Sequence, residues 1–136
     1  MSCFADVRPD IVLARNEAVR LSNLALSLER RAPLAAGLLL EEIDRAEIRA
    51  DADMPDDVVR MYSMLSYIDE LHDKARSIVL VYPAEADISA GKVSVATPIG
   101  AGLIGLSPGQ SIRWPDLEGR WRRLEVLKVS PMRLKF

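Results

Sequence analysis

The part of this chain that most restricts its fold is residues 79–106, VLVYPAEADISAGKVSVATPIGAGLIGL. It runs from an apolar segment through an acidic loop to a second apolar segment, and then to a segment with three glycines. Apolar runs of this kind are typical of covered strands, so we expect strands at 77–82 and 93–96. The glycines in 99–106 predict a short helical turn that packs tightly on the sheet. No side chain in the stretch suits covalent chemistry at neutral pH, which favours docking over catalysis.

The first third of the chain shows helical periodicity. Apolar residues recur at steps of three and four, which predicts two amphipathic helices with one buried stripe each. We expect Asn16 to cap the first helix and Pro33 to lie in the first turn of the second. Four residues between the helices indicate an antiparallel hairpin of about 15 residues per helix. The stripes comprise Ala18, Leu21, Ala25 and Leu28 in one helix, and Ala36, Leu40, Ile43 and Ala46 in the other.

An acidic, helix-breaking segment at 51–57 marks the expected joint between two parts. Beyond it the period changes, and further strands are expected near 59–65, 111–114 and 121–129, with a polar hairpin loop at 69–74. We therefore predict an α+β fold. Residues 1–53 form a short antiparallel helical hairpin, and residues 54–136 form a small antiparallel sheet domain with one short helix.

Composition excludes several classes of protein. The 136 residues are 49% apolar with a net charge of −2, which argues against a general nucleic-acid binder. Cys3 is the only cysteine, so neither an internal disulfide nor a cysteine metal site is expected. The longest apolar run, 33–40, is too short to cross a bilayer. We expect a cytoplasmic protein with no membrane partner.

Three motifs resemble the C-terminal domain of the Gre-type transcription factors of bacteria. They are Glu85-Ala86-Asp87, Thr97-Pro98 and Leu103-Ile104-Gly105. Segments 55–59, 81–83 and 40–46 are closer to the Rnk-type regulators of nucleoside diphosphate kinase, a shorter branch of that family. The resemblance extends over about residues 10–130. It implies an FKBP-like sheet domain that binds the rim of the RNA polymerase secondary channel, with the hairpin directed towards the channel.

The resemblance also implies which residues face the polymerase, in the acidic loop and in the turn that follows. For the turn, simple core packing stays open as the alternative. The docking candidates are Glu85, Asp87, Thr97, Pro98, Ile99, Leu103 and Gly105.

The expected hairpin tip departs from the family pattern. Gre factors carry a pair of acids there that help to hold a catalytic metal, whereas this tip reads Glu29-Arg30-Arg31. Two adjacent guanidinium groups repel a divalent cation. The hairpin is also short, reaching roughly 22 Å at 1.5 Å per residue. We therefore expect a regulator of elongation that competes with Gre factors and does not stimulate transcript cleavage.

We predict no catalytic residue, metal ligand or cofactor site. His72 has no second histidine to complete a metal site, and a solvated loop position is favoured. The acids Glu41, Glu42, Asp44 and Glu47 are interpreted as a solvated helix face. The glycines of 100–105 lack the βαβ unit of a dinucleotide site.

Three weaker interpretations stay open. Arg120, Trp121, Arg122 and Arg123 combine bases with an aromatic ring, but a solvated outer face is favoured over a single-strand nucleic-acid site. The FKBP-like fold allows a prolyl isomerase, which needs an aromatic-lined pocket. The stripes Leu21/Leu28 and Leu40/Ile43 allow self-association, although a monomer is favoured.

Overall fold

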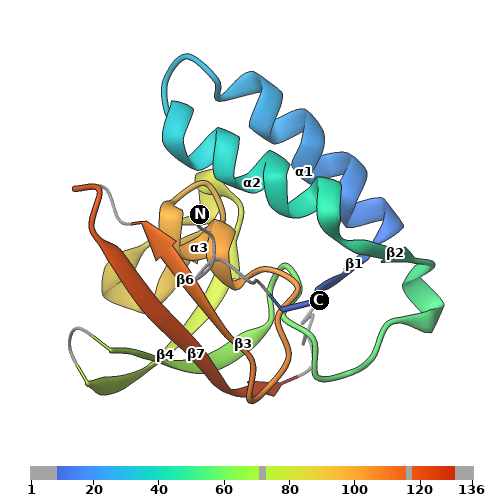
Figure 1. The fold of residues 1–136 in the computed structure, drawn as a ribbon. Coiled ribbons are helices and arrows are strands. Elements are labelled where there is room, and N and C mark those ends of the chain that lie inside the picture. The colour runs from blue at the N-terminus through green and yellow to red at the C-terminus, as the bar shows by residue number, and fades with distance from the viewer. Residues whose placement is uncertain (1–8, 71–72, 116–117, 131–136) are drawn as a thin grey trace, which may run out of the picture.

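The computed structural model describes residues 9–70, 73–115 and 118–130. Helices α1 (Arg15–Ser27) and α2 (Pro33–Arg45) have 13 residues each and form the predicted antiparallel hairpin (Figure 1). Pro33 occupies the first turn of α2, as predicted. The predicted cap of α1 at Asn16 is wrong, because the helix starts at Arg15, two residues earlier than expected, and its cap residue Ala14 makes no side-chain hydrogen bond. No helix in the described ranges is long and apolar enough to cross a membrane.

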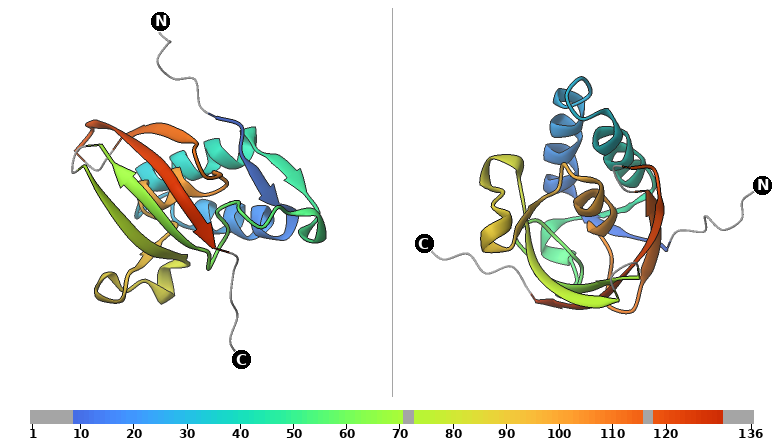
Figure 2. Two further views of the ribbon diagram at one scale, coloured as in Figure 1. Left: turned by 90° about the horizontal axis from the view of Figure 1, so that it is seen from below. Right: turned by 90° about the vertical axis from the view of Figure 1, so that its left-hand side faces the viewer.

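A five-stranded sheet follows the hairpin, in the order β5-β4-β3-β7-β6. It curls around the short helix α3, as the right-hand view of Figure 2 shows. The α+β prediction is confirmed, but the sheet is mixed, since β4 and β5 pair in parallel. The elements are β3 (Met64–Asp69), β4 (Lys74–Val81), β5 (Lys92–Ser94), α3 (Pro98–Leu103), β6 (Ser111–Pro115) and β7 (Trp121–Ser130).

Short elements complete the chain. The strand β1 (Val12–Ala14) comes directly before α1, and β2 (Glu47–Arg49) follows α2. The two strands pair in parallel with each other. The single-turn 3-10 helices are η2 (Asp51–Asp53), η3 (Pro83–Glu85) and η4 (Ile88–Ala90). Of these, η3 and η4 lie in the connection between β4 and β5, and they form the acidic loop of the sequence.

One hydrophobic core holds the hairpin and the sheet together. Leu21 of α1 and Leu39 of α2 are fully buried in the same cluster as strand residues such as Val126. Ile11 lies directly against Gly105, where an added Cβ would come within 2.9 Å of the Ile11 Cβ. Gly105 also has a φ of +84°, which favours glycine for a second reason. The hairpin therefore packs on the sheet domain instead of standing apart from it.

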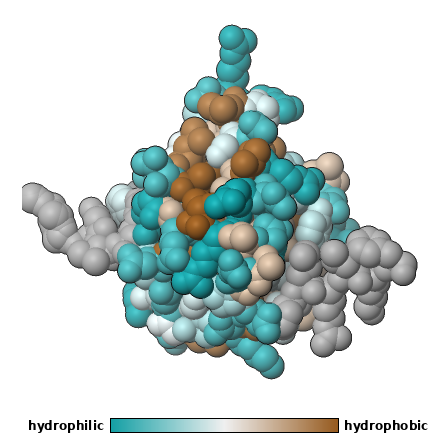
Figure 3. All heavy atoms as spheres, turned by 90° about the vertical axis from the view of Figure 1, so that its right-hand side faces the viewer, coloured by the Kyte–Doolittle hydropathy of each residue, from teal (hydrophilic) through white to brown (hydrophobic). Residues whose placement is uncertain are grey.

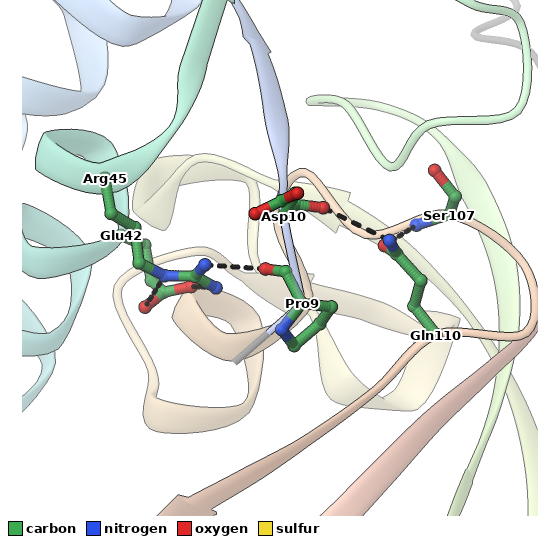
Figure 4. A network of polar contacts seen from close by, with 6 residues as sticks. All are labelled: Pro9, Asp10, Glu42, Arg45, Ser107 and Gln110. Atoms are coloured by element: carbon green, nitrogen blue, oxygen red, sulfur yellow. Dashed lines mark hydrogen bonds and ion pairs between the residues drawn. The ribbon is translucent and has the colours of Figure 1, made fainter. Parts of the chain in front are cut away.

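Polar contacts hold Pro9 and Asp10 at this junction (Figure 4). The guanidinium of Arg45 makes two hydrogen bonds to Glu42, of 3.0 and 2.7 Å, and donates a third to the Pro9 carbonyl at 2.6 Å. Gln110 donates to the Asp10 carbonyl at 3.1 Å. The prediction that Glu42 is solvated is wrong: its side chain is fully buried, and Arg45 compensates its charge.

Candidate docking surface

The Thr97-Pro98 motif starts helix α3. The Thr97 hydroxyl accepts a hydrogen bond from the Gly100 amide at 3.1 Å and donates one to the Ser94 carbonyl at 2.7 Å. Pro98 then occupies the first helical position, which suits its fixed φ. An added Cβ on Gly100 would lie 2.2 Å from the Ser94 oxygen, so glycine lets α3 approach the end of β5. The motif thus sets the position of the turn.

Two acids are presented by the loop between β4 and β5. Glu85 accepts a hydrogen bond from the Tyr62 hydroxyl at 2.6 Å. Asp87 caps η4, accepting from the Ser89 amide at 3.1 Å and from the Ser89 hydroxyl at 2.6 Å. The bond from Ser89 lowers the pKa of Asp87, because it favours the charged carboxylate. Both side chains are exposed but held in place.

Aromatic contacts connect this loop to helix α1. Tyr62 and Tyr82 meet edge to face with ring centroids 6.0 Å apart. The guanidinium of Arg20 lies 4.9 Å from the Tyr82 centroid, within cation–π range. The bond to Glu85 is the main cause that raises the pKa of Tyr62 to about 12, because it favours the neutral phenol. The sequence analysis missed Arg20, Tyr62 and Tyr82, whose spacing along the chain gives no sign that they meet.

A pocket of about 490 Å³ lies between the acidic loop and α3. Thr97, Pro98 and Ile99 line one part of it, and Ala86 and Ile88 of the acidic loop line another. The structure therefore brings three of the docking candidates to one hollow, next to the loop that carries Glu85 and Asp87. Leu103 is fully buried and Gly105 is buried against Ile11 at the junction with the hairpin, so neither lines the pocket.

The hairpin tip lies in the turn between α1 and α2, with Glu29, Arg30 and Arg31 all exposed. Thirteen helical residues at 1.5 Å each give a reach of roughly 20 Å. Among the described residues, no group of three or more His, Cys, Asp or Glu side chains is placed to hold a metal ion. His72 and Cys3 lie outside the described residues.

The basic segment 120–123, at the start of β7, does not form a continuous outer face. Arg122 forms an ion pair with the buried Asp69, and its side chain is only 16% exposed. Its register opposite Trp114 places it on the concave side of the sheet. The prediction of a solvated Arg122 is therefore wrong, while Trp121 and Arg123 are exposed as expected.

The structure also bears on self-association and on prolyl isomerase activity. Leu21 is fully buried and Leu28 is 9% exposed, so the stripe expected to self-associate is used in the chain's own core. Exposed apolar side chains, Val19 and Leu26, lie elsewhere on α1, and apolar groups gather towards the hairpin end of the face in Figure 3.

Of the described aromatic residues, Tyr67 alone lines the pocket, which is not the aromatic lining that a prolyl isomerase needs.

The comparisons with known proteins give one consistent result. The family model "Transcription elongation factor, GreA/GreB, C-term" matches residues 54–131. The chain is 38% identical over 128 residues to the Regulator of nucleoside diphosphate kinase of Escherichia coli K12, covering 90% of each chain. It is 33% identical over 133 residues to the transcription elongation factor GreA of Acidiphilium cryptum, covering 92% of this chain and 84% of that one.

A solved structure agrees with these sequence matches. The transcription elongation factor GreA/GreB from Nitrosomonas europaea has a TM-score of 0.69 and 32% identity, covering 90% of this chain and 99% of that one. The likeness includes the hairpin as well as the sheet domain, since most of both chains is aligned. The chain belongs to the GreA/GreB family of transcription elongation factors, in which it is similar over nearly its whole length to the regulator of nucleoside diphosphate kinase.

Proposed function

We propose that this protein binds RNA polymerase at the rim of the secondary channel and competes there with Gre factors, without stimulating transcript cleavage. The observation that carries the proposal is the combination of a Gre-family domain with a hairpin of two 13-residue helices. The domain supplies the docking surface, and the hairpin occupies the channel entrance.

The docking surface consists of the acidic loop and the start of α3. Glu85 and Asp87 offer exposed carboxylates whose positions are held by Tyr62 and Ser89. Ile99 supplies partly exposed apolar area beside them. A surface that is already ordered loses little conformational entropy on binding. Charged groups beside an apolar contact also suit a specific protein interface.

The tip supports the absence of cleavage activity. A second catalytic Mg²⁺ needs carboxylate ligands, and Glu29 is the only acid of the tip, next to the exposed Arg30 and Arg31. The guanidinium groups repel the cation and attract the carboxylate of Glu29. A reach of roughly 20 Å further restricts how far the tip enters the channel.

The test is capture of core RNA polymerase by the full-length protein, with a cleavage-competent Gre factor as competitor. Ile99→Glu places a charge in the surface and is expected to weaken capture at least tenfold. Leu127→Glu is the matched control, since Leu127 is 43% exposed on β7 and does not line the pocket beside the docking surface; it is expected to bind normally.

Transcript cleavage is measured in the same complexes. Competition without cleavage supports the proposal in full. Failure of the wild-type protein to bind polymerase overturns the docking, and stimulated cleavage overturns the role assigned to the tip.

A further inference from the structure

The pocket beside the docking candidates has the size and lining of a small-molecule site. Its volume of about 490 Å³ falls in the usual range of roughly 300–1,000 Å³. Its apolar lining includes Val93, Pro98 and Ile99 from β5 and α3, and Ile88 from the loop. Ile88 is 87% exposed, so its side chain is available to cover the body of a bound molecule.

The charged groups around the pocket are mostly cationic. Arg76, Lys92 and Arg122 line it, against the single carboxylate of Glu118. Arg122 is paired with Asp69. Glu118 is 71% exposed and lies 3.5 Å from Arg120, so its charge is compensated outside the pocket.

Arg76 and Lys92 differ from these groups, since neither forms an ion pair with any residue that the structure describes. Arg76 pairs in register with Tyr67, so its side chain lies on the concave side of the sheet with the buried Tyr67 ring. A guanidinium in that position can form two parallel hydrogen bonds to a carboxylate, sulfonate or phosphate. The Lys92 ammonium is near enough to Asp87 to help lower the pKa of that carboxyl. The pocket therefore combines apolar walls with positive charge, and Arg76 carries the part of it that has no carboxylate partner among the described residues.

We infer that this pocket binds a small amphipathic anion, whose apolar body lies against Val93, Pro98 and Ile99 and whose acidic group pairs with Arg76. Lys92 adds a second positive charge to the same pocket. A neutral molecule of the same shape lacks the ionic contact and binds more weakly. A hydrophilic anion lacks the apolar contact and therefore also binds more weakly.

Occupation of the pocket has a consequence for docking, and this part rests on the proposed function. Thr97, Pro98 and Ile99 line the pocket and also belong to the predicted polymerase-binding surface. A bound anion and the polymerase then compete for the same side chains, so the anion acts as an inhibitor of docking.

The first experiment measures binding to the full chain of two fluorescent probes with the same aromatic body. Anilinonaphthalene sulfonate is an amphipathic anion, and phenylnaphthylamine is its neutral analogue. The sulfonate is expected to bind at least tenfold more tightly. Equal affinity for the two probes would overturn the inference of an anion site.

Four variants locate the binding. Arg76→Met is expected to weaken the sulfonate about tenfold, as for loss of a charge-assisted hydrogen bond, with no change for the neutral probe. Arg113→Met removes the same charge from an exposed position on β6 outside the pocket and should change neither. Ala86→Trp fills the pocket and should abolish binding of both probes. Ala84→Trp, an exposed neighbour that does not line the pocket, is its control.

Melting curves confirm that all four variants are folded. Sulfonate binding that survives both Arg76→Met and Ala86→Trp would overturn the site. The polymerase capture assay with added sulfonate tests the shared surface separately. If the sulfonate binds the pocket but polymerase capture persists, the competition is wrong while the ligand site stands.

Discussion

The protonation of Glu17 is controlled by its burial and by its contact with Arg60. Its side chain is 11% exposed, and one oxygen accepts a hydrogen bond from the Arg60 Nε at 3.2 Å. The other oxygen has no hydrogen-bond partner within residues 9–70, 73–115 and 118–130. Burial raises the pKa of Glu17 above the ordinary value of 4.5, and Arg60 opposes that shift without cancelling it.

The raised pKa makes stability depend on pH. Well below pH 4.5 the carboxyl is protonated in the folded and unfolded states alike. As the pH rises towards the native pKa, the unfolded chain loses its proton first, so the free energy of unfolding falls. Glu17→Gln removes this fall, so the variant should lose less stability than the wild type as the pH rises from 4.5 to 7.

Urea denaturation at a series of pH values measures the effect. The control is Asp44→Asn, which neutralises an exposed carboxylate on α2 and should keep the wild-type pH dependence. If Glu17→Gln and the wild type show parallel curves, burial of this carboxylate does not control the pH dependence.

Residues such as Glu17 and Glu42 show where sequence reasoning ends at this scale. Helical periodicity placed Glu42 correctly in a helix, but its burial depends on Arg45 and on the Pro9 carbonyl that Arg45 also contacts. Glu17 depends on Arg60, which is 43 residues away. A charged residue in a polar pattern is solvated by default, and only the tertiary partner reverses that expectation.

At the scale of elements, the glycines of α2 and α3 have opposite roles. Gly100 in α3 has no space for a side chain, because an added Cβ would lie 2.2 Å from the Ser94 oxygen and 2.8 Å from the Val95 Cα. Gly37 in α2 has no atom within 4 Å of the same position and is exposed.

The two glycine-to-alanine substitutions are therefore expected to differ in sign. Gly100→Ala should lower the free energy of unfolding by about 2 kcal/mol, because backbone atoms must shift. Gly37→Ala should raise it by about 0.5–1 kcal/mol, since alanine has the higher helix propensity. Urea denaturation of both variants gives the comparison. Equal effects would mean that the contact between α3 and β5 is looser than the structure has it.

Most individual helices and strands were predictable from the sequence, and the pairing between distant strands was not. Both hairpin helices, α3 and the ten-residue β7 follow from apolar spacing and turn residues. The three-residue β5 was still predicted from its apolar residues, whereas the pairing of β1 with β2 was missed, because its partners are 35 residues apart. The parallel pairing of β5 depends on how the chain crosses through η3 and η4, which residue pattern does not specify.

At the scale of the whole molecule, the Arg45–Glu42 pair joins α2 to the segment before β1, through the bond from Arg45 to the Pro9 carbonyl. Arg45→Met removes the guanidinium that pairs with the buried Glu42 carboxylate, so it should lower the free energy of unfolding by about 3 kcal/mol. The double variant Glu42→Leu with Arg45→Met removes the charge as well and should recover most of that loss. Denaturation of the single and double variants tests this, and a double variant no more stable than Arg45→Met would contradict the account.

Because the hairpin and the sheet share one core, they should unfold together. Ile11 and Leu13 pack under Gly105, and the Gly105 and Val59 backbones are hydrogen-bonded at 2.9 Å. Helical dichroism mainly reports α1 and α2, while fluorescence in a Trp121→Phe background reports Trp114, which is 2% exposed inside the sheet domain.

The two probes are expected to give the same urea midpoint, within error, for a single transition. A helical signal lost at lower urea would show that the hairpin detaches before the sheet unfolds. That distinction bears on function, since a hairpin fixed to the domain extends only roughly 20 Å towards its target. A hairpin that detaches could change its direction when the domain docks. On the proposed function, coincident transitions favour a protein that approaches the polymerase channel as one rigid body.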